Sequence, residues 1–404
     1  TAVNSSILDD EDDTTSLSLS SATGTITLTA KIDIGSTDGQ AGIRPGFIDI
    51  DTTNLSDGSI TLTGDVGSDI YLNFLNGDFS SSYLVSPNGV APNNTSPENS
   101  INSLTIGATD GNLVVDNDIF NQDDAGNPGG IYYDLYLLTN NNLTLSNPIE
   151  TNVDILELGT GGDLTLTMTN ITFYNPNGTL ILWADFDHDS SGALTGGSYG
   201  APVTLTNVDN LILIAGSGIN VYTAAATAAD PINIAAYNST SGEINIDNIG
   251  DITIFDGTGY VGVPGIDVNG VNNESGGDVN ITAHSDVNIN APINTFGGNL
   301  NVSATESITH NALGDITTSG GTYTGNFDSD DNDLGAYTMA DIGTDASVIN
   351  IGTGNVYLIG GRLLTGFGGE DITIAQIISD TSSSSVYLVT ANGSIIETTN
   401  ETGG

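Results

Sequence analysis

Two acidic loops contain the residues whose types and spacing are best suited to chemistry. In the first loop, Asp185, Asp187 and Asp189 alternate with other residues and are followed by Gly192. Alternating carboxylates in a loop can converge on a hard cation, and calcium takes six to eight oxygen ligands. The spacing resembles the start of an EF-hand loop, but the glycine and the closing glutamate of that loop are missing. The pattern therefore indicates either a calcium site of another geometry or a solvated acidic turn.

The second acidic loop has the same character. Its oxygen-bearing side chains come from Asp328, Asp330, Asn332 and Asp333, and the same two interpretations are open. The charge of the whole chain favours cation binding, because 3 Lys+Arg stand against 50 Asp+Glu and the formal net charge is −47. Divalent ions relieve the repulsion where carboxylates crowd. We therefore expect Ca²⁺ to be a cofactor of these two loops.

The same composition excludes several functions. Three cationic side chains, Lys31, Arg44 and Arg362, cannot neutralise a run of phosphates, so we expect no nucleic-acid partner. The absence of cysteine excludes a disulfide scaffold and thiolate zinc sites. No apolar run is long enough for a membrane helix, so we expect no membrane insertion. Such scarcity of Lys and Arg indicates an extracellular or cell-surface protein. Because the chain starts at Thr1, we expect a mature exported form or a fragment.

Catalytic motifs are scarce in this sequence. His188 lies inside the first acidic loop, and we expect His284 and His310 to be structural or exposed. No Gly-x-Ser-x-Gly motif comes with a suitable histidine and acid. We therefore expect a protein that is not an enzyme. The alternative is a polysaccharide-degrading β-helix enzyme or a carbohydrate-binding module, in which carboxylates and tyrosines such as Tyr136 would line a cleft.

The elements that must position these residues are short β-strands. Apolar residues alternate with Thr, Asn, Ser or Asp along most of the chain, which is typical of a strand with one buried and one solvated face. The segment Val279-Asn-Ile281 returns as Leu300-Asn-Val302, and Val287 and Ile308 would form a second face. Recurrence of similar strands at this spacing favours stacked coils over hairpins. We expect an almost all-β protein.

A recurring strand opener separates these strands. It consists of a glycine, a small polar residue and an aliphatic residue, as in Gly242-Glu-Ile244, Gly250-Asp-Ile252, Gly277-Asp-Val279 and Gly298-Asn-Leu300. A glycine adopts positive φ angles without steric cost. We expect each opener glycine to form the positive-φ corner between two strands.

Residues 276–325 resemble the shaft repeats of filamentous-haemagglutinin-like adhesins, which are secreted by the two-partner route. The likeness extends from Gly242 to the C-terminus and fades toward the N-terminus. It implies a right-handed parallel β-helix (a β-solenoid) on a bacterial surface. It also implies a structural role, as an adhesin shaft or as a subunit of an extracellular filament or layer.

The domain organisation follows from the same comparison along the chain. We expect residues 151–404 to form the parallel β-helix, and residues 1–150 to form a more irregular β-rich region. That first region could be a cap, a β-sandwich or coils with large insertions. Stacked coils expose unpaired strand edges at their ends. We therefore expect self-association into a homopolymer or fibre, with a carbohydrate or a host surface as a further possible partner.

Overall fold

The computed structural model describes most of the second two-thirds of the chain. Before residue 134, it describes only strand segments. From there to residue 397 it describes the chain except for residues 147, 152, 168–169, 175–176, 187–188, 226–230, 262–265, 331–334, 341–345, 362–370, 380–382 and 391–392.

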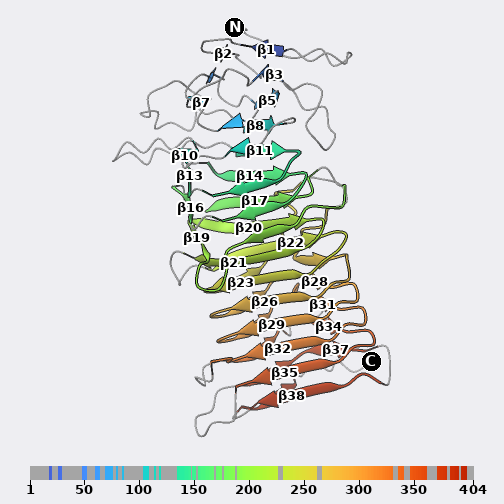
Figure 1. Ribbon diagram of the computed structural model, residues 1–404. Helices are drawn as coiled ribbons and strands as arrows, with labels where there is room; N and C mark the ends of the chain where they lie inside the picture. Colours follow the sequence, from blue (N-terminus) through green and yellow to red (C-terminus); the bar gives the residue numbers. More distant parts are fainter. Residues whose placement is uncertain are drawn as a thin grey trace. The chain divides into compact units, whose positions relative to one another are not determined.

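The described part of the chain is all-β and consists of stacked parallel strands (Figure 1). Every pairing between its named strands for which a register is defined is parallel, and the antiparallel contacts among these residues are two isolated bridges, Ser198 with Ala201 and Asp256 with Asn269. This parallel β-helix agrees with the stacked coils that the recurrence of similar strands favoured and with the fold that the resemblance implied. No helix in the described segments is long and apolar enough to cross a membrane.

The chain divides into two compact units. The N-terminal unit comprises Thr1–Gly197 and Val203–Asp209, and the C-terminal unit comprises Ser198–Pro202 and Asn210–Gly404. In both units, strands pair with strands one coil away rather than with their neighbours in sequence.

The described strands of the N-terminal unit form five ladders. The longest runs through β1 (Ser18–Ser20), β3 (Ile48–Asp51), β5 (Asp69–Leu75), β8 (Ser103–Ala108), β11 (Asp134–Thr139), β14 (Ile155–Thr160) and β17 (Gly178–Ala184). A second contains β10 (Asp118–Ile119), β13 (Ile149–Thr151), β16 (Asn170–Phe173) and β19 (Val203–Thr206), and a third contains β12 (Leu143–Leu145), β15 (Leu164–Leu166) and β18 (Leu194–Gly196). Two short ladders are β2 (Ile26–Thr29), β4 (Ile60–Thr63) and β7 (Leu84–Val85), and β6 (Phe79–Ser80) with β9 (Leu113–Val114).

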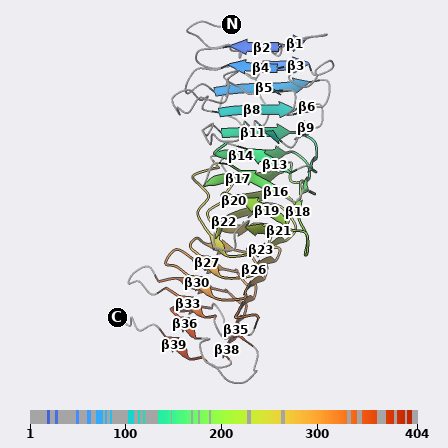
Figure 2. The ribbon, with the colours of Figure 1, turned by 90° about the vertical axis from the view of Figure 1, so that its left-hand side faces the viewer.

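Three ladders make up the C-terminal unit, so that a full coil contributes three strands. The first contains β21 (Ile219–Ala225), β23 (Ile244–Ile249), β26 (Val279–Ala283), β29 (Leu300–Ala304), β32 (Tyr323–Phe327), β35 (Val356–Gly360) and β38 (Val386–Thr390). The second contains β24 (Ile252–Ile254), β27 (Val287–Ile289), β30 (Ile308–His310), β33 (Tyr337–Met339), β36 (Ile372–Ile374) and β39 (Ile395–Glu397), and Figure 2 shows several of them in one column. The third contains β25 (Val271–Asn273), β28 (Ile293–Asn294), β31 (Ile316–Thr317), β34 (Val348–Asn350) and β37 (Gln376–Ile378); β22 (Ile232–Asn238) pairs with β24, β25 and β20 (Val208–Ala215).

The register places like residues on like residues. Val279 pairs with Leu300, as predicted, and the intervening Asn280 pairs with Asn301. The Asn301 amide group donates to the Asn280 side-chain oxygen at 2.8 Å, so the polar face is also ordered along the stack. On the other face, buried aliphatic and aromatic side chains form a column that runs through Ile244, Val279, Leu300, Tyr323 and Val356.

The opener glycines have two different roles. Gly242 and Gly250 have positive φ angles of 87° and 124°, as expected. At Gly277 and Gly298 the expectation was wrong, because the positive φ angles of 73° and 117° belong to the preceding Gly276 and Gly297. A Cβ atom on Gly298 would collide with the carbonyl oxygen of Gly277 in the preceding coil. Glycine is needed at Gly298 because two backbones approach closely there.

The polar residue of the opener joins successive coils. The Asp278 carboxylate accepts a hydrogen bond from the backbone N–H of Asn299 at 2.8 Å, and the Asn299 side chain accepts one from Thr322 at 3.0 Å. Asp315 makes the same contact with the backbone N–H of Val348 at 2.8 Å. These bonds satisfy backbone donors at the corners, where the strand ladders stop.

Parallel pairing is not confined to the second part of the chain. Strands β5, β8 and β11, all before residue 150, pair in parallel register. Among the described segments, this pairing fits the alternative of coils with insertions. The expected boundary near residue 150 stays a prediction, and the two compact units meet in sequence near residue 200.

Candidate functional site

Two carboxylates of the first acidic loop accept backbone hydrogen bonds within the loop. Asp185 is buried, has a φ angle of 70°, and accepts a hydrogen bond from the backbone N–H of Ser190 at 2.9 Å. Asp189 accepts one from the backbone N–H of Ser191 at 3.0 Å. Asp187 lies outside the described residues. These contacts are those of a tight acidic turn, and the calcium site proposed for this loop stays a prediction.

The second acidic loop begins in the core. Asp328 is fully buried, and its backbone N–H donates to the carbonyl oxygen of Glu306 at 2.8 Å. Asp330 is exposed, whereas Asn332 and Asp333 lie outside the described residues. Partial burial raises the pKa of Glu306, and the negative charges of Asp286, Asp251 and Asp330 raise it further. Within the described segments, no three His, Asp or Glu residues have the geometry of a metal site.

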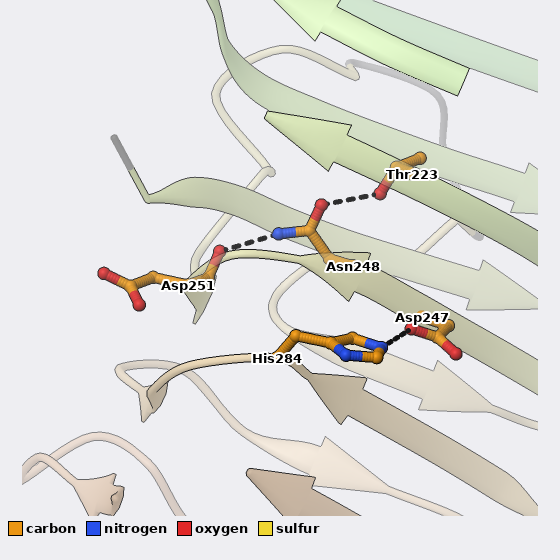
Figure 3. Close-up of polar contacts among 5 residues, drawn as sticks. All are labelled: Thr223, Asp247, Asn248, Asp251 and His284. Atoms are coloured by element: carbon orange, nitrogen blue, oxygen red, sulfur yellow. Dashed lines mark hydrogen bonds and ion pairs between the residues drawn. The ribbon is translucent and has the colours of Figure 1, made fainter. Parts of the chain in front are cut away.

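A histidine–aspartate pair lies on the solvated face of the first ladder of the C-terminal unit. His284, directly after β26, places its Nε2 atom 3.0 Å from an Asp247 carboxylate oxygen on β23 (Figure 3). Because a carboxylate only accepts, Nε2 carries the proton and Nδ1 is the second polar atom of the ring. Burial raises the pKa of Asp247, and the neighbouring His284 opposes that shift. No hydroxyl group in the described segments hydrogen-bonds Nδ1, so the pair lacks the nucleophile of a triad.

Two tyrosine rings lie next to this pair. Tyr222 on β21 lies in register with Asp247. Its ring stands edge-on to that of His284, with centroids 6.4 Å apart, and edge-on to that of Tyr199, with centroids 6.1 Å apart. The four side chains come from four separate segments of the C-terminal unit.

The residue next to Asp247 points into the core instead. Asn248 is fully buried, and its side-chain oxygen accepts a hydrogen bond from the Thr223 hydroxyl at 2.9 Å, while its amide group donates to the backbone oxygen of Asp251 at 3.0 Å (Figure 3). Consecutive side chains of a strand point to opposite faces. The buried contacts of Asn248 therefore hold the strand that presents Asp247.

His310 belongs to a buried polar chain in the C-terminal unit. Its Nδ1 faces the carbonyl oxygen of Gly314 at 3.2 Å, so the neutral ring accepts through Nε2 from the Tyr337 hydroxyl at 2.7 Å. The Tyr323 hydroxyl lies 3.2 Å from that of Tyr337. Burial lowers the pKa of His310 to about 4 and raises the pKa of both tyrosines. The three side chains are fully buried, which fits a structural role.

Glu157 is a buried titratable group of the N-terminal unit. It lies on β14, in register with Tyr136 on β11 and Ile181 on β17. No described residue makes a hydrogen bond or an ion pair with its carboxyl group, and burial raises its pKa to about 7. Burial accounts for this shift, and no described charged side chain contributes to it.

Sequence reasoning found the acidic loops but missed the surface pair. His284 was expected to be structural or exposed, and nothing in the sequence connected it with Asp247 or Tyr199. The coil register could have predicted this contact. Asp247 and Thr282 are equivalent positions of successive strands, and His284 follows Thr282 by two residues.

No family model, no curated protein and no solved structure matches the chain. The resemblance to filamentous-haemagglutinin-like repeats therefore stays a prediction.

Proposed function

We propose that the chain is a non-enzymatic, extracellular structural protein of the adhesin-shaft or filament type, and that it assembles end to end with a second copy. The observation that supports this is the exposure of the last described coil, β38 and β39. Val386 is 46% exposed, whereas its in-register partner Val356 is fully buried. Ile395 is 54% exposed, whereas its partner Ile372 is fully buried.

This coil offers what a further strand needs. No described strand pairs with the outer edge of β38 or β39, and an unpaired strand edge is a template on which a further strand can pair. The outward side of this coil also offers a contact. The Tyr387 ring stacks on the Tyr357 ring with ring planes 3° apart, and no described aromatic ring covers the other face of Tyr387. A parallel strand with alternating aliphatic residues would pair with the edge and bury Val386.

A second copy of the chain supplies such a strand. Strands with alternating aliphatic residues occur in both units, so a second copy carries strands of the kind that this edge could pair with. Head-to-tail contacts of this kind build open filaments unless the rotation between copies closes a ring. The net charge of −47 opposes the contact, so assembly should require salt or divalent cations.

Calcium is the cation that the acidic loops favour. The support is the crowding of carboxylates around Glu306 together with the buried Asp328. We infer that calcium binding at the loops of Asp185 and Asp328 stabilises the fold and lowers the repulsion between copies.

The test is the mass distribution of the purified chain by sedimentation velocity, with electron microscopy, in millimolar calcium. We expect mass to rise with protein concentration and filaments to form. Val386→Asp and Ile395→Asp should abolish this, whereas Thr324→Asp, on the outward face of β32, should not. A wild-type chain that stays monomeric under all these conditions would overturn the proposal.

A further inference from the structure

The turn that presents Tyr199 is short and well ordered. Ser198 and Ala201 exchange two backbone hydrogen bonds of 3.0 and 2.8 Å, and Gly200 has a φ angle of 89°. The Tyr199 ring at the tip of this turn is 87% exposed. An aromatic ring held by a tight turn loses little conformational freedom when a ligand covers it.

Polar groups lie beside this ring. The side chains of His284 and Asp247 are 36% and 32% exposed, so both remain accessible after they pair with each other. Their pairing uses Nε2 of His284 and one oxygen of Asp247. The second carboxylate oxygen and Nδ1 make no hydrogen bond to a described residue, so they can bond a ligand.

Tyr222 packs beneath the two parts and connects them. It is only 8% exposed, and its ring lies edge-on to the ring of Tyr199 and to the ring of His284. The distance between the ring centroids of Tyr199 and His284 is therefore at most the sum of the 6.1 Å and 6.4 Å separations. A short oligosaccharide is long enough to reach both rings.

We propose that Tyr199, Tyr222, Asp247 and His284 form a binding subsite for a neutral pyranose sugar. The apolar C–H face of a pyranose ring stacks on an exposed tyrosine ring, while its hydroxyl groups donate to the carboxylate and bond the imidazole. A neutral sugar is favoured over an acidic one, because the Asp247 carboxylate would repel a second negative charge. This subsite is independent of the end-to-end assembly proposed above.

Saturation-transfer NMR with neutral oligosaccharides of glucose, galactose, mannose and N-acetylglucosamine tests the proposal on the full chain. We expect saturation at the ring C–H protons of at least one of these sugars. Tyr199→Ala should weaken that binding about tenfold, the loss of one aromatic stacking contact. Asp247→Asn and His284→Gln should weaken it as well.

Tyr260→Ala is the matched control, since Tyr260 is a partly exposed tyrosine of the same unit outside the subsite. It should leave sugar binding unchanged. Because Tyr199 is so exposed, Tyr199→Ala should keep the wild-type melting temperature and the wild-type assembly, which separates this test from that of the filament. Absence of binding to all four sugar classes, or binding that survives Tyr199→Ala, would overturn the proposal.

Discussion

The two units differ in what covers the outside of their sheets. All seven residues of β17 in the N-terminal unit are buried, whereas β29 in the C-terminal unit alternates between buried and half-buried positions. On β17 a second apolar layer forms, in which the Trp183 ring stands edge-on to that of Phe186 at 4.8 Å. A sheet covered on both faces leaves no solvated side for polar groups. The accessible side chains of Tyr199, Asp247 and His284 lie instead on the C-terminal unit, where strands such as β29 keep a solvated face.

The buried titratable groups show the same difference. Glu157 lies on the outer face of β14, opposite the core residues Leu156 and Leu158, and has no described hydrogen-bond partner. His310 lies in the core of the C-terminal unit with a partner on each ring nitrogen. Burial favours the neutral form of both, so their effects on stability have opposite dependence on pH.

The largest expected effect is that of Glu157→Gln. The folded-state pKa of about 7 lies above the ordinary 4.5, so the stability contributed by the protonated carboxyl group is complete below pH 4.5 and is lost as pH rises through 7. The substitution should raise the free energy of unfolding by about 3 kcal/mol at pH 8 and leave it unchanged at pH 4. Urea denaturation at both pH values measures this.

The exposed Glu243 supplies the control for that experiment, since Glu243→Gln should change stability little at either pH. An equal effect of Glu157→Gln at pH 4 and pH 8 would mean that the carboxyl group is not held in an apolar layer.

Tyr337→Phe tests the hydrogen bond that the Tyr337 hydroxyl donates to His310 in the C-terminal unit. The substitution leaves Nε2 of His310 buried without a donor, which should cost about 2 kcal/mol at pH 7. Tyr357→Phe removes an outward hydroxyl and should cost less than about 0.5 kcal/mol. Similar losses from both, measured by urea denaturation, would show that the buried chain of hydroxyl groups adds no stability.

In the wild-type chain, the pKa of His310 predicts acid sensitivity. Because it lies at about 4 against an ordinary 6.5, stability is complete above pH 6.5 and is lost as pH falls through 4.

Calcium removal should have the smallest effect and would show which unit holds an ion. At a free calcium concentration tenfold above the dissociation constant, one site contributes about 1.4 kcal/mol, or a few degrees of melting temperature. Calorimetry with and without a chelator measures this shift. Asp189→Asn would remove it from the N-terminal unit and Asp330→Asn from the C-terminal unit. An unchanged melting profile in chelator would leave both loops as solvated turns.

Much of the fold could be predicted from single strands. The pairing of Val279 with Leu300 and of Val287 with Ile308 is confirmed, because period-two alternation and coil spacing are local properties of the chain. The third ladder, to which Ile293 and Ile316 belong, was not predicted. Its strands contribute as few as two residues, too short for alternation to be visible.

The sequence by itself determined that the chain is β-rich, coiled and strongly acidic. Composition, alternation and the recurrence of similar strands can be recognised without knowing which distant residues are in contact. Only the tertiary structure decided which polar groups meet. Asp247 and His284 are 37 residues apart, and Tyr199 is farther still from both. Their meeting depends on the length of each coil, which varies with the loops between the strands. Alternation within a strand says which face a side chain takes, but the coil register selects its neighbours on that face.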